Sequence, residues 1–274
     1  LNFASAIDDC EFGVTHIIRG IDLEVSGDKQ KFIYDYFGWT YPHTLYHGRF
    51  FISGIRSMSE ALELIKEGKL TGWDDPRLGT IAALRKRGFL SKALVNFVME
   101  LGLGRADINV NIDSLAAHNR NVVDKIAKRF FVVFNPRKIK INNAPKMKIK
   151  ILLHPEFPKI GYREFETNNE FYVDETFESG KYYRFIDLFN FRNLEYMSTE
   201  LDGSVNVKFI HWLPVSKDLI NVEVVMPDNT VKIGFGEKGI RYLNIGDVIQ
   251  LVRIGFCRLD RKYGKKCVFY FAHR

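Results

Sequence analysis

The amino-acid sequence predicts a multidomain protein in which an α/β part is followed by a helical part and then by an all-β part. The prediction depends on the spacing of apolar residues, which changes twice along the chain. Short buried strands alternate with a helix up to residue 56, helical spacing follows to about residue 130, and period-two alternation continues to the end. With 274 residues, 46% of them hydrophobic, the chain is long enough for two or three packed modules.

The first part has the pattern of a βαβ unit. We interpret "THIIRG" as a buried strand that ends at Gly20, and "SGDKQKFIYDYFGW" as an amphipathic helix with Ser26 at its N-cap. A second strand is expected at "FISGIR". This alternation of strands and a helix favours part of a nucleotide-binding α/β sheet.

Helical spacing dominates the second part. The segment "SMSEALELIKEG" has Ser57 and Glu60 at the spacing of a capping box, and "PRLGTIAALRKRG" has Pro76 near its start and Gly88 at its end. Two further amphipathic helices are expected at "LSKALVNFVMELGLG" and "IDSLAAHNRNVVDKIAKRF". Between the first two segments lies the unusual run "LTGWDDPRL", which we interpret as a structural turn that fixes a helix start.

The third part has the alternation of β-strands. Turn sequences such as "PDN", "DGS" and "YGKK" separate the predicted strands. Antiparallel strands at such short spacing predict barrels or a sandwich. The expected strands are "FFVVFN", "KMKIKILL", "EFYVDE", "VNVKFIHWL", "INVEVVM", "DVIQLVRIGF" and "KCVFYFAH".

Composition narrows the class of protein. A net charge of +7 attracts polyanions, of which nucleic acid is the commonest, although many basic proteins bind none. Cys10, Cys257 and Cys267 form no CxxC pair, so the sequence favours neither a disulfide framework nor a structural metal, and a reducing, cytoplasmic protein is expected. No apolar run approaches the ~20 residues that span a bilayer, and the acidic N-terminus is unlike a signal peptide.

A family resemblance rests on six runs: "IDDCEFGVTHIIRG", "GWDDPRLGTIAALRKRG", "HPEFPKIGYR", "IHWLP", "IQLVRIGFCRLD" and "FYFAHR". In this order they resemble the C-terminal half of glutamyl-tRNA synthetases of the archaeal and eukaryotic type, and more distantly glutaminyl-tRNA synthetases. The resemblance implies the second half of a Rossmann-like catalytic sheet at 1–56, then a KMSKS-like loop with a helical stem-contact region at 57–130. It implies two anticodon-binding β-barrels at 131–274.

Arg19, at the end of "THIIRG", is the most informative residue of the resemblance. The glutamyl branch of the family has Arg at this position, where it is taken to meet the side-chain carboxylate of glutamate, and the glutaminyl branch has a small neutral residue. The chemistry agrees, because a guanidinium forms a bidentate pair with a carboxylate, whereas the amide of glutamine presents donors to donors. An ordinary surface arginine at a strand end is the alternative.

The resemblance also implies a nucleotide site. Arg49 and Phe50 match the pair that borders adenine, although "GRF" is also a common way to enter a strand. Ser57, Met58 and Ser59 match the catalytic KMSKS-type loop that lies beside the triphosphate. ATP is therefore expected as a substrate, as its Mg²⁺ complex.

Seven residues are implied to contact tRNA: Arg85, Lys86, Arg87, Arg163, Lys208, Gln250 and Arg253. Gln250 and Arg253 match the Gln-x-x-Arg with which the glutaminyl branch reads anticodon bases, and such side chains suit the edges of unstacked bases. Within a strand these two side chains point to opposite faces unless a bulge intervenes. The Arg-Lys-Arg run offers charge to phosphates, or else is a solvated charge run.

The sequence departs from an active synthetase in three places. The family's His-x-Gly-His motif is absent from the sequence, Glu60 stands where the KMSKS-type loop has a lysine, and Leu1 replaces a Tyr. A carboxylate near a departing pyrophosphate opposes the charge stabilisation that the reaction needs, although a capping role also explains Glu60. Three explanations stay open: a subunit of a split synthetase, a fragment of an ordinary one, or a paralogue that binds tRNA without catalysis. The first two predict a large exposed apolar edge on residues 1–56.

These observations predict a ligase of protein biosynthesis. We expect it to form glutamyl-adenylate from L-glutamate and ATP and to transfer glutamate to tRNA(Glu) when paired with an N-terminal catalytic half, and to be inactive alone. Whether tRNA(Gln) is also a substrate stays open, as does the oligomeric state. The alternatives are a non-catalytic tRNA-binding protein and a glutaminyl-tRNA synthetase, and no membrane partner is expected.

Overall fold

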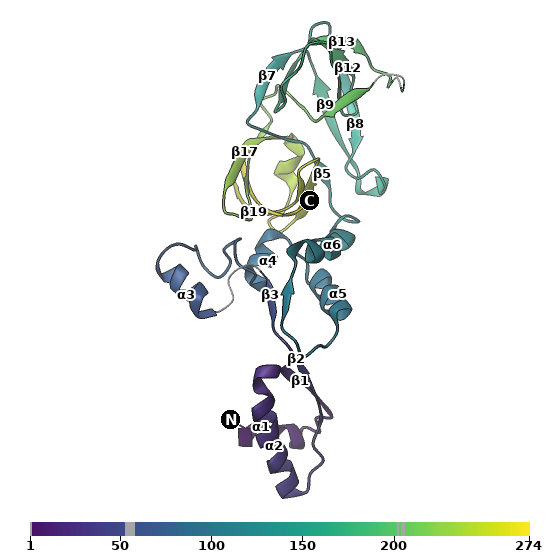
Figure 1. The fold of residues 1–274 in the computed structure, drawn as a ribbon. Helices are drawn as coiled ribbons and strands as arrows, with labels where there is room; N and C mark the ends of the chain where they lie inside the picture. The colour runs from purple at the N-terminus through teal and green to yellow at the C-terminus, as the bar shows by residue number, and fades with distance from the viewer. Residues whose placement is uncertain (1, 53–57, 202, 204–205) are drawn as a thin grey trace.

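The protein extends as a row of units, with the N-terminal segment at one end and a strand-rich unit at the other (Figure 1). This computed structural model describes residues 2–52, 58–201, 203 and 206–274. The C-terminus lies in the middle of the molecule, close to the helices, so the last strands return from the far end (Figure 1). The predicted mixed α/β part and the predicted strand-rich part are both present.

The N-terminal segment is built on a two-stranded parallel sheet. Strands β1 and β2 pair from His16 and His43 to Gly20 and His47. Helices α1 and α2 pack on each other, and α2 ends at Gly38 in a left-handed conformation (φ 69°) that suits glycine. The elements are α1 (Asn2–Glu11), β1 (His16–Gly20), η1 (Ile21–Leu23), α2 (Glu24–Phe37), β2 (His43–His47) and β3 (Phe50–Ile52).

Two predictions for this segment are wrong in detail. The strand that pairs with β1 is "HTLYH", because the chain turns back to the sheet soon after Gly38. Part of "FISGIR" does form a strand, β3, but this strand pairs with β4 (Ile108–Val110) and not with β1. Helix α2 begins at Glu24, so Ser26 lies inside it and is no N-cap. The 3₁₀ turn η1 leads directly into α2, and the helix start therefore needs no side-chain cap at Ser26.

The helical part packs against the last strands. Helix α4 begins after Thr80, whose hydroxyl accepts a hydrogen bond from the Ala83 amide, and it ends at Gly88. Pro76 therefore lies before the helix rather than in its first turn. Leu84 and Leu115 share a core with Phe256 of the C-terminal strands, so the helical and strand parts fold against one interior. The elements are α3 (Met58–Lys66), α4 (Ile81–Arg87), α5 (Ser91–Leu101), β4 (Ile108–Val110) and α6 (Ile112–Val123).

The rest of the chain is rich in strands. The elements are β5 (Arg129–Phe130), β6 (Val132–Phe134), β7 (Arg137–Lys140), β8 (Met147–Leu152), η2 (Pro158–Ile160), β9 (Tyr162–Thr167), β10 (Glu170–Val173), β11 (Tyr182–Phe185), β12 (Asn190–Arg192), β13 (Glu195–Ser198), β14 (Val207–Ile210), β15 (Leu213–Pro214), β16 (Ile220–Val225), β17 (Val231–Gly236), η3 (Lys238–Tyr242), β18 (Val248–Leu251), β19 (Gly255–Tyr263) and β20 (Lys266–His273). They form two β units, each with its own core.

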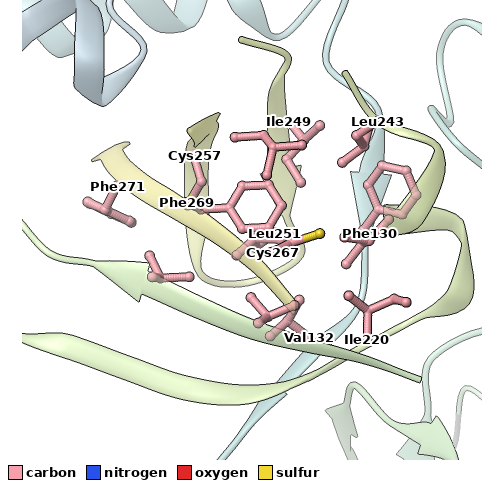
Figure 2. Close-up of a cluster of buried hydrophobic side chains, with 14 of the residues drawn as sticks. Phe130, Val132, Ile220, Leu243, Ile249, Leu251, Cys257, Cys267, Phe269 and Phe271 are labelled. Atoms are coloured by element: carbon pink, nitrogen blue, oxygen red, sulfur yellow. The ribbon is translucent and has the colours of Figure 1, made fainter. Parts of the chain in front are cut away.

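One β unit is a curled seven-stranded sheet in the order β5-β18-β19-β20-β16-β17-β6. Its two edge strands, β5 and β6, are separated along the chain only by Phe131, so the sheet curls and brings these two edges close together at that residue. Apolar side chains, among them Leu251, Cys267 and Phe269, fill its interior (Figure 2). Cys257 and Cys267 are free thiols in this core, and burial raises the pKa of both.

The second β unit is inserted between β6 and β16 of the first. Its core is aromatic, with Phe171, Phe185 and Trp212 in mutual ring contact. Strands β11 and β14 pair in parallel, as do β16 with β20 and β5 with β18. Antiparallel pairing is thus accompanied by these three parallel pairs, and no hairpin connects the two strands of any of the three.

Candidate functional site

Arg19 lies on β1 beside Tyr46 of β2, and its side chain reaches helix α2. The guanidinium Nη1 donates to Gln30 Oε1 over 2.7 Å, and Gln30 is itself buried. This hydrogen bond to a neutral amide orients the guanidinium without cancelling its charge. Burial raises the pKa of Tyr46, and the charge of Arg19 acts in the opposite direction. Arg19 is therefore held toward α2 by an uncharged partner.

Arg49 and Phe50 lie where the chain passes from β2 into β3. The Asp107 carboxylate accepts from both the Arg49 amide (2.8 Å) and its guanidinium (2.9 Å), and this contact lowers the pKa of Asp107. Phe50 stacks on His47 with ring centroids 6.3 Å apart. Gly48 fits here because a Cβ would lie 2.0 Å from the Ala106 carbonyl oxygen. The sequence analysis missed Asp107, which is 58 residues from Arg49.

The KMSKS-like residues begin helix α3. Ser57 lies outside the described residues, whereas Met58 and Ser59 are exposed in the first turn of the helix. Glu60 is also in this first turn, where a carboxylate is favoured by the helix dipole. Ala61 packs on Leu78, so α3 rests against the turn that follows it.

The run "LTGWDDPRL" is a self-contained polar turn around Asp75. This carboxylate is fully buried, and it accepts from the Thr71 amide (2.9 Å), the Arg77 amide (3.0 Å) and Arg77 Nε (2.8 Å). Burial alone raises the pKa of Asp75, but these hydrogen bonds outweigh it and lower the pKa well below its ordinary value. Arg77 also donates to the Lys69 carbonyl. The polar groups of this run form hydrogen bonds with one another, which supports its interpretation as a structural turn.

The Arg-Lys-Arg run divides into three different environments. Arg85 is exposed, whereas Lys86 pairs with Asp74 over 2.8 Å and lies 4.8 Å from the Tyr270 ring. Arg87 is buried and donates to the carbonyls of Phe271 (3.2 Å) and Ala272 (2.7 Å). Burial lowers the pKa of Arg87 to about 10, so it stays protonated at neutral pH. Two donors of Arg87 thus bond to strand β20, which does not favour the expected phosphate contact by this residue.

Arg163, on β9, is buried between the two β units. Its Nη1 donates to Glu237 Oε1 over 2.9 Å and to the Arg129 carbonyl, and its guanidinium lies 4.3 Å from the Phe131 ring. Burial lowers the pKa of Arg163 and raises that of Glu237 to about 7. Arg163 therefore does not project from the surface as a free cation.

Lys208 lies on β14 of the second β unit, and Arg253, from the turn after β18 of the curled sheet, reaches the same strand. Lys208 Nζ pairs with Glu175 over 2.7 Å, and Arg253 donates to the carbonyl of the neighbouring Phe209 over 2.5 Å. Arg253 has a φ of 65° and lies in the turn after β18, not in the strand. The expected conflict of opposite strand faces with Gln250 therefore does not arise.

Contacts link the anticodon candidates into one region. Arg163 donates to the Arg129 carbonyl, Arg129 is the register partner of Gln250, and Val252 precedes Arg253. Arg163, Arg129 and Val252 line one cavity of about 450 Å³ at the junction of the β units. The Nε atoms of both arginines and Oε1 of Gln250 are buried and have no hydrogen-bond partner among the described residues. Sequence reasoning missed Arg129 and Glu237, which no local pattern marks.

Two features are absent from the described residues. No helix there is both long and apolar enough to cross a lipid bilayer. No cluster of three or more His, Cys, Asp and Glu side chains in this part of the chain could hold a metal ion.

Comparisons with known proteins agree with the predicted family. Residues 1–125 match the model of the catalytic domain of class I (E and Q) tRNA synthetases, and 127–211 and 209–260 match models of their anticodon-binding domain. The whole chain aligns with glutamate–tRNA ligases of Methanocaldococcus jannaschii (39% identity, 52% of that protein), Pyrococcus furiosus (41%, 50%) and Methanosarcina barkeri (41%, 50%). The chain thus spans about half the length of these relatives. It belongs to the class I (E and Q) tRNA synthetases.

Proposed function

We propose that this chain is the C-terminal portion or subunit of a glutamate–tRNA ligase. The observation that carries the proposal is the alignment of the whole chain, at 39–41% identity, with about half of three such ligases. In the assembled enzyme the carboxylate of glutamate attacks the α-phosphorus of ATP and pyrophosphate leaves. A ribose hydroxyl at the end of the tRNA then attacks the activated carbonyl, and AMP leaves.

Arg19 would select glutamate in this enzyme. Its guanidinium is oriented by the neutral Gln30, so its charge is available to a ligand carboxylate. The amide N–H groups of a glutamine side chain would face the N–H donors of the Arg19 guanidinium, and two sets of donors cannot form hydrogen bonds with each other. This argues against glutamine as the substrate. The runner-up among enzymes, a glutaminyl-tRNA synthetase, is disfavoured for this reason.

Arg49 and Phe50 would border the adenine of ATP, and Ser57, Met58 and Ser59 would lie beside its triphosphate. ATP would enter as its Mg²⁺ complex, so the metal belongs to the substrate. The pairing of the Arg49 amide with Asp107 holds the main chain in place at this point, and backbone groups suit recognition of an adenine edge. Carboxyl activation would also need the catalytic half that this sequence lacks.

An N-terminal catalytic half would cover the apolar surface of residues 2–37. Phe12, Phe32 and Tyr36 are 84%, 73% and 92% exposed, and Ile18 on the narrow β1–β2 sheet is also exposed. Large apolar side chains gathered on one segment mark an interaction surface. The requirement for a partner half applies equally to a split enzyme and to a fragment of a longer chain.

The remainder of the chain would bind tRNA(Glu). We propose the division 1–56, 57–130 and 131–274 for the catalytic, stem-contact and anticodon-binding parts, with the two β units as barrels. Arg85 offers an exposed charge for phosphates, and the junction lined by Arg163 would take part in reading the anticodon, with Gln250 and Arg253 beside it.

A non-catalytic tRNA-binding protein is the second candidate. Glu60 favours it, because this carboxylate lies in the first turn of α3, beside the proposed triphosphate site. Such a protein would keep the anticodon-binding region and would have no use for the Arg19–Gln30 arrangement.

The test is glutamylation of total tRNA by the chain, alone and with the N-terminal half of a related glutamate–tRNA ligase, added separately or fused. We expect activity only in the combined samples. The variant Arg19→Gln should lose at least about 100-fold in kcat/KM for glutamate, since a buried charge pair with the substrate disappears. Arg105→Gln, which removes an exposed ion pair with Glu24, is the matched control. Salt-dependent tRNA binding without any glutamylation would support the second candidate.

A further inference from the structure

We propose that Glu237 is a positioning residue for anticodon recognition, because its carboxylate holds the Arg163 guanidinium in the wall of the cavity between the two β units. The inference rests on the proposed function, in which this cavity belongs to the anticodon-reading region. Neither the sequence patterns nor the family resemblance assigns a role to Glu237.

Glu237 connects the two β units through a single oxygen atom. It follows β17 of the curled sheet, precedes η3, and is 3% exposed. Oε1 accepts from the Phe131 amide over 2.6 Å and from Arg163 Nη1 over 2.9 Å. Since Phe131 joins the two edges of the curled sheet, the carboxylate ties Arg163 of the other unit to that seam.

Three contacts restrict the plane of the Arg163 guanidinium. Besides Glu237, it donates to the Arg129 carbonyl and lies over the Phe131 ring. All three partners belong to the curled sheet or its edges, whereas Arg163 itself comes from β9. A planar guanidinium held at its end and on its face has one orientation, which is the condition for reading a base.

Arg163 has space on two sides, so its orientation depends on a partner. It lines the cavity of about 450 Å³ with Arg129, Lys150 and Asp187, and a second cavity of about 480 Å³ with Glu164 and other residues. Asp187, in the first cavity, is the second carboxylate whose charge acts on Arg163, whereas Glu164 lies on the exposed face of β9 and pairs with Lys150 over 3.2 Å. Glu237 lines the second cavity and not the first, so its hydrogen bond to Arg163 holds the guanidinium in the wall between the two cavities.

The experiment measures anticodon preference with the whole 274-residue chain. The probe is a fluorescein-labelled anticodon stem-loop of tRNA(Glu), compared with stem-loops in which one anticodon base is replaced. Glu237→Gln keeps the shape and an amide oxygen that can accept from Phe131, but it removes the charge. The preference is the Kd for a loop with a replaced base divided by the Kd for the natural loop. We expect this ratio to be about tenfold lower for Glu237→Gln than for the unchanged chain, which corresponds to the loss of one oriented base contact. The salt dependence of binding, which reports phosphate contacts, should not change.

Two further variants separate positioning from stability. Glu223→Gln changes a carboxylate on β16 that pairs with Lys266 over 2.7 Å in the same sheet, and it should keep the preference. Arg163→Lys keeps the buried charge balance but loses the planar group, and it should lose the same preference as Glu237→Gln. The double variant should lose no more than either single one, because the two residues act as a unit.

The outcomes distinguish the inference from the function on which it rests. If the unchanged chain binds all loops equally, the proposed anticodon role fails and the inference fails with it. If the unchanged chain prefers the natural loop and Glu237→Gln retains that preference, the inference alone fails. Equal weakening of every loop by Glu237→Gln, or additive losses in the double variant, would also overturn it, since either result shows a structural role only.

Discussion

Burial decides what each basic side chain of this protein can do. Arg85 and Arg87 are two residues apart on α4, yet the first is exposed and the second is buried and donates two hydrogen bonds to carbonyls of β20. A charge run in a sequence therefore overstates the charge that a nucleic acid can reach. Arg163 shows the same effect, since its charge is balanced inside the protein by Glu237.

The two arginines of α4 should separate stability from RNA binding. We expect Arg87→Ala to lower the free energy of unfolding by about 3 kcal/mol, because it leaves the Phe271 and Ala272 carbonyls without their donor. Arg85→Ala should change stability by less than about 0.5 kcal/mol and reduce the salt slope of tRNA binding by about 1. Urea unfolding and binding at several salt concentrations measure these effects. A large stability loss in Arg85→Ala would contradict this assignment.

At the scale of elements, short polar contacts position the helices. The turn around Asp75 links the end of the α3 region to Thr80, which caps α4 and also donates to the Trp73 carbonyl. Its hydrogen-bond donors are its own neighbours in sequence, and its flanking Leu70 and Leu78 pack against α3 and α4. Its stability depends on one buried carboxylate, which makes it sensitive to acid.

Acid unfolding should reveal Asp75. Its pKa in the folded protein is lowered from an ordinary value of 3.8, so its contribution to stability is present above about pH 4 and is lost as the pH falls through the lower folded value. Asp75→Asn should be less stable by about 3 kcal/mol at pH 7, and the difference should shrink between pH 4 and pH 2. Asp74→Asn, which removes an ion pair that is half exposed, should cost less than about 1 kcal/mol. A pH-independent deficit in Asp75→Asn would refute the linkage.

At the scale of the whole molecule, the chain order and the spatial order differ. The unit that contains β7 to β15 is inserted into the curled sheet, and the last strands return to pack on the helices. Asn119 of α6 contacts both the Leu90 amide and His273 of β20, which joins the helical part to the end of the chain. The proposed anticodon region thus lies on the same sheet that supports the helices.

The shared core should make the helical part and the curled sheet unfold together. Phe256 lies on β19 but packs into the helical core, so Phe256→Ala should cost about 3–5 kcal/mol and lower hydrogen-exchange protection in α5 and α6 as well as in β19. Leu259→Ala, on the same strand but in the core of the curled sheet, is the control. If Phe256→Ala leaves the helices fully protected, the two parts are independent units.

The sequence by itself determined the family, the order of the α/β, helical and strand-rich parts, and the end of β1 at Gly20 beside Arg19. These features depend on contiguous residues, whose spacing and type are readable without a fold. The tertiary structure alone decided that "HTLYH" pairs with β1, that Arg253 lies in a turn, and that Arg87 and Arg163 are buried. The physical reason is distance along the chain: Arg87 and its acceptor at Phe271 are 184 residues apart, and Arg163 and Glu237 are 74 apart, so no local pattern can show that they meet.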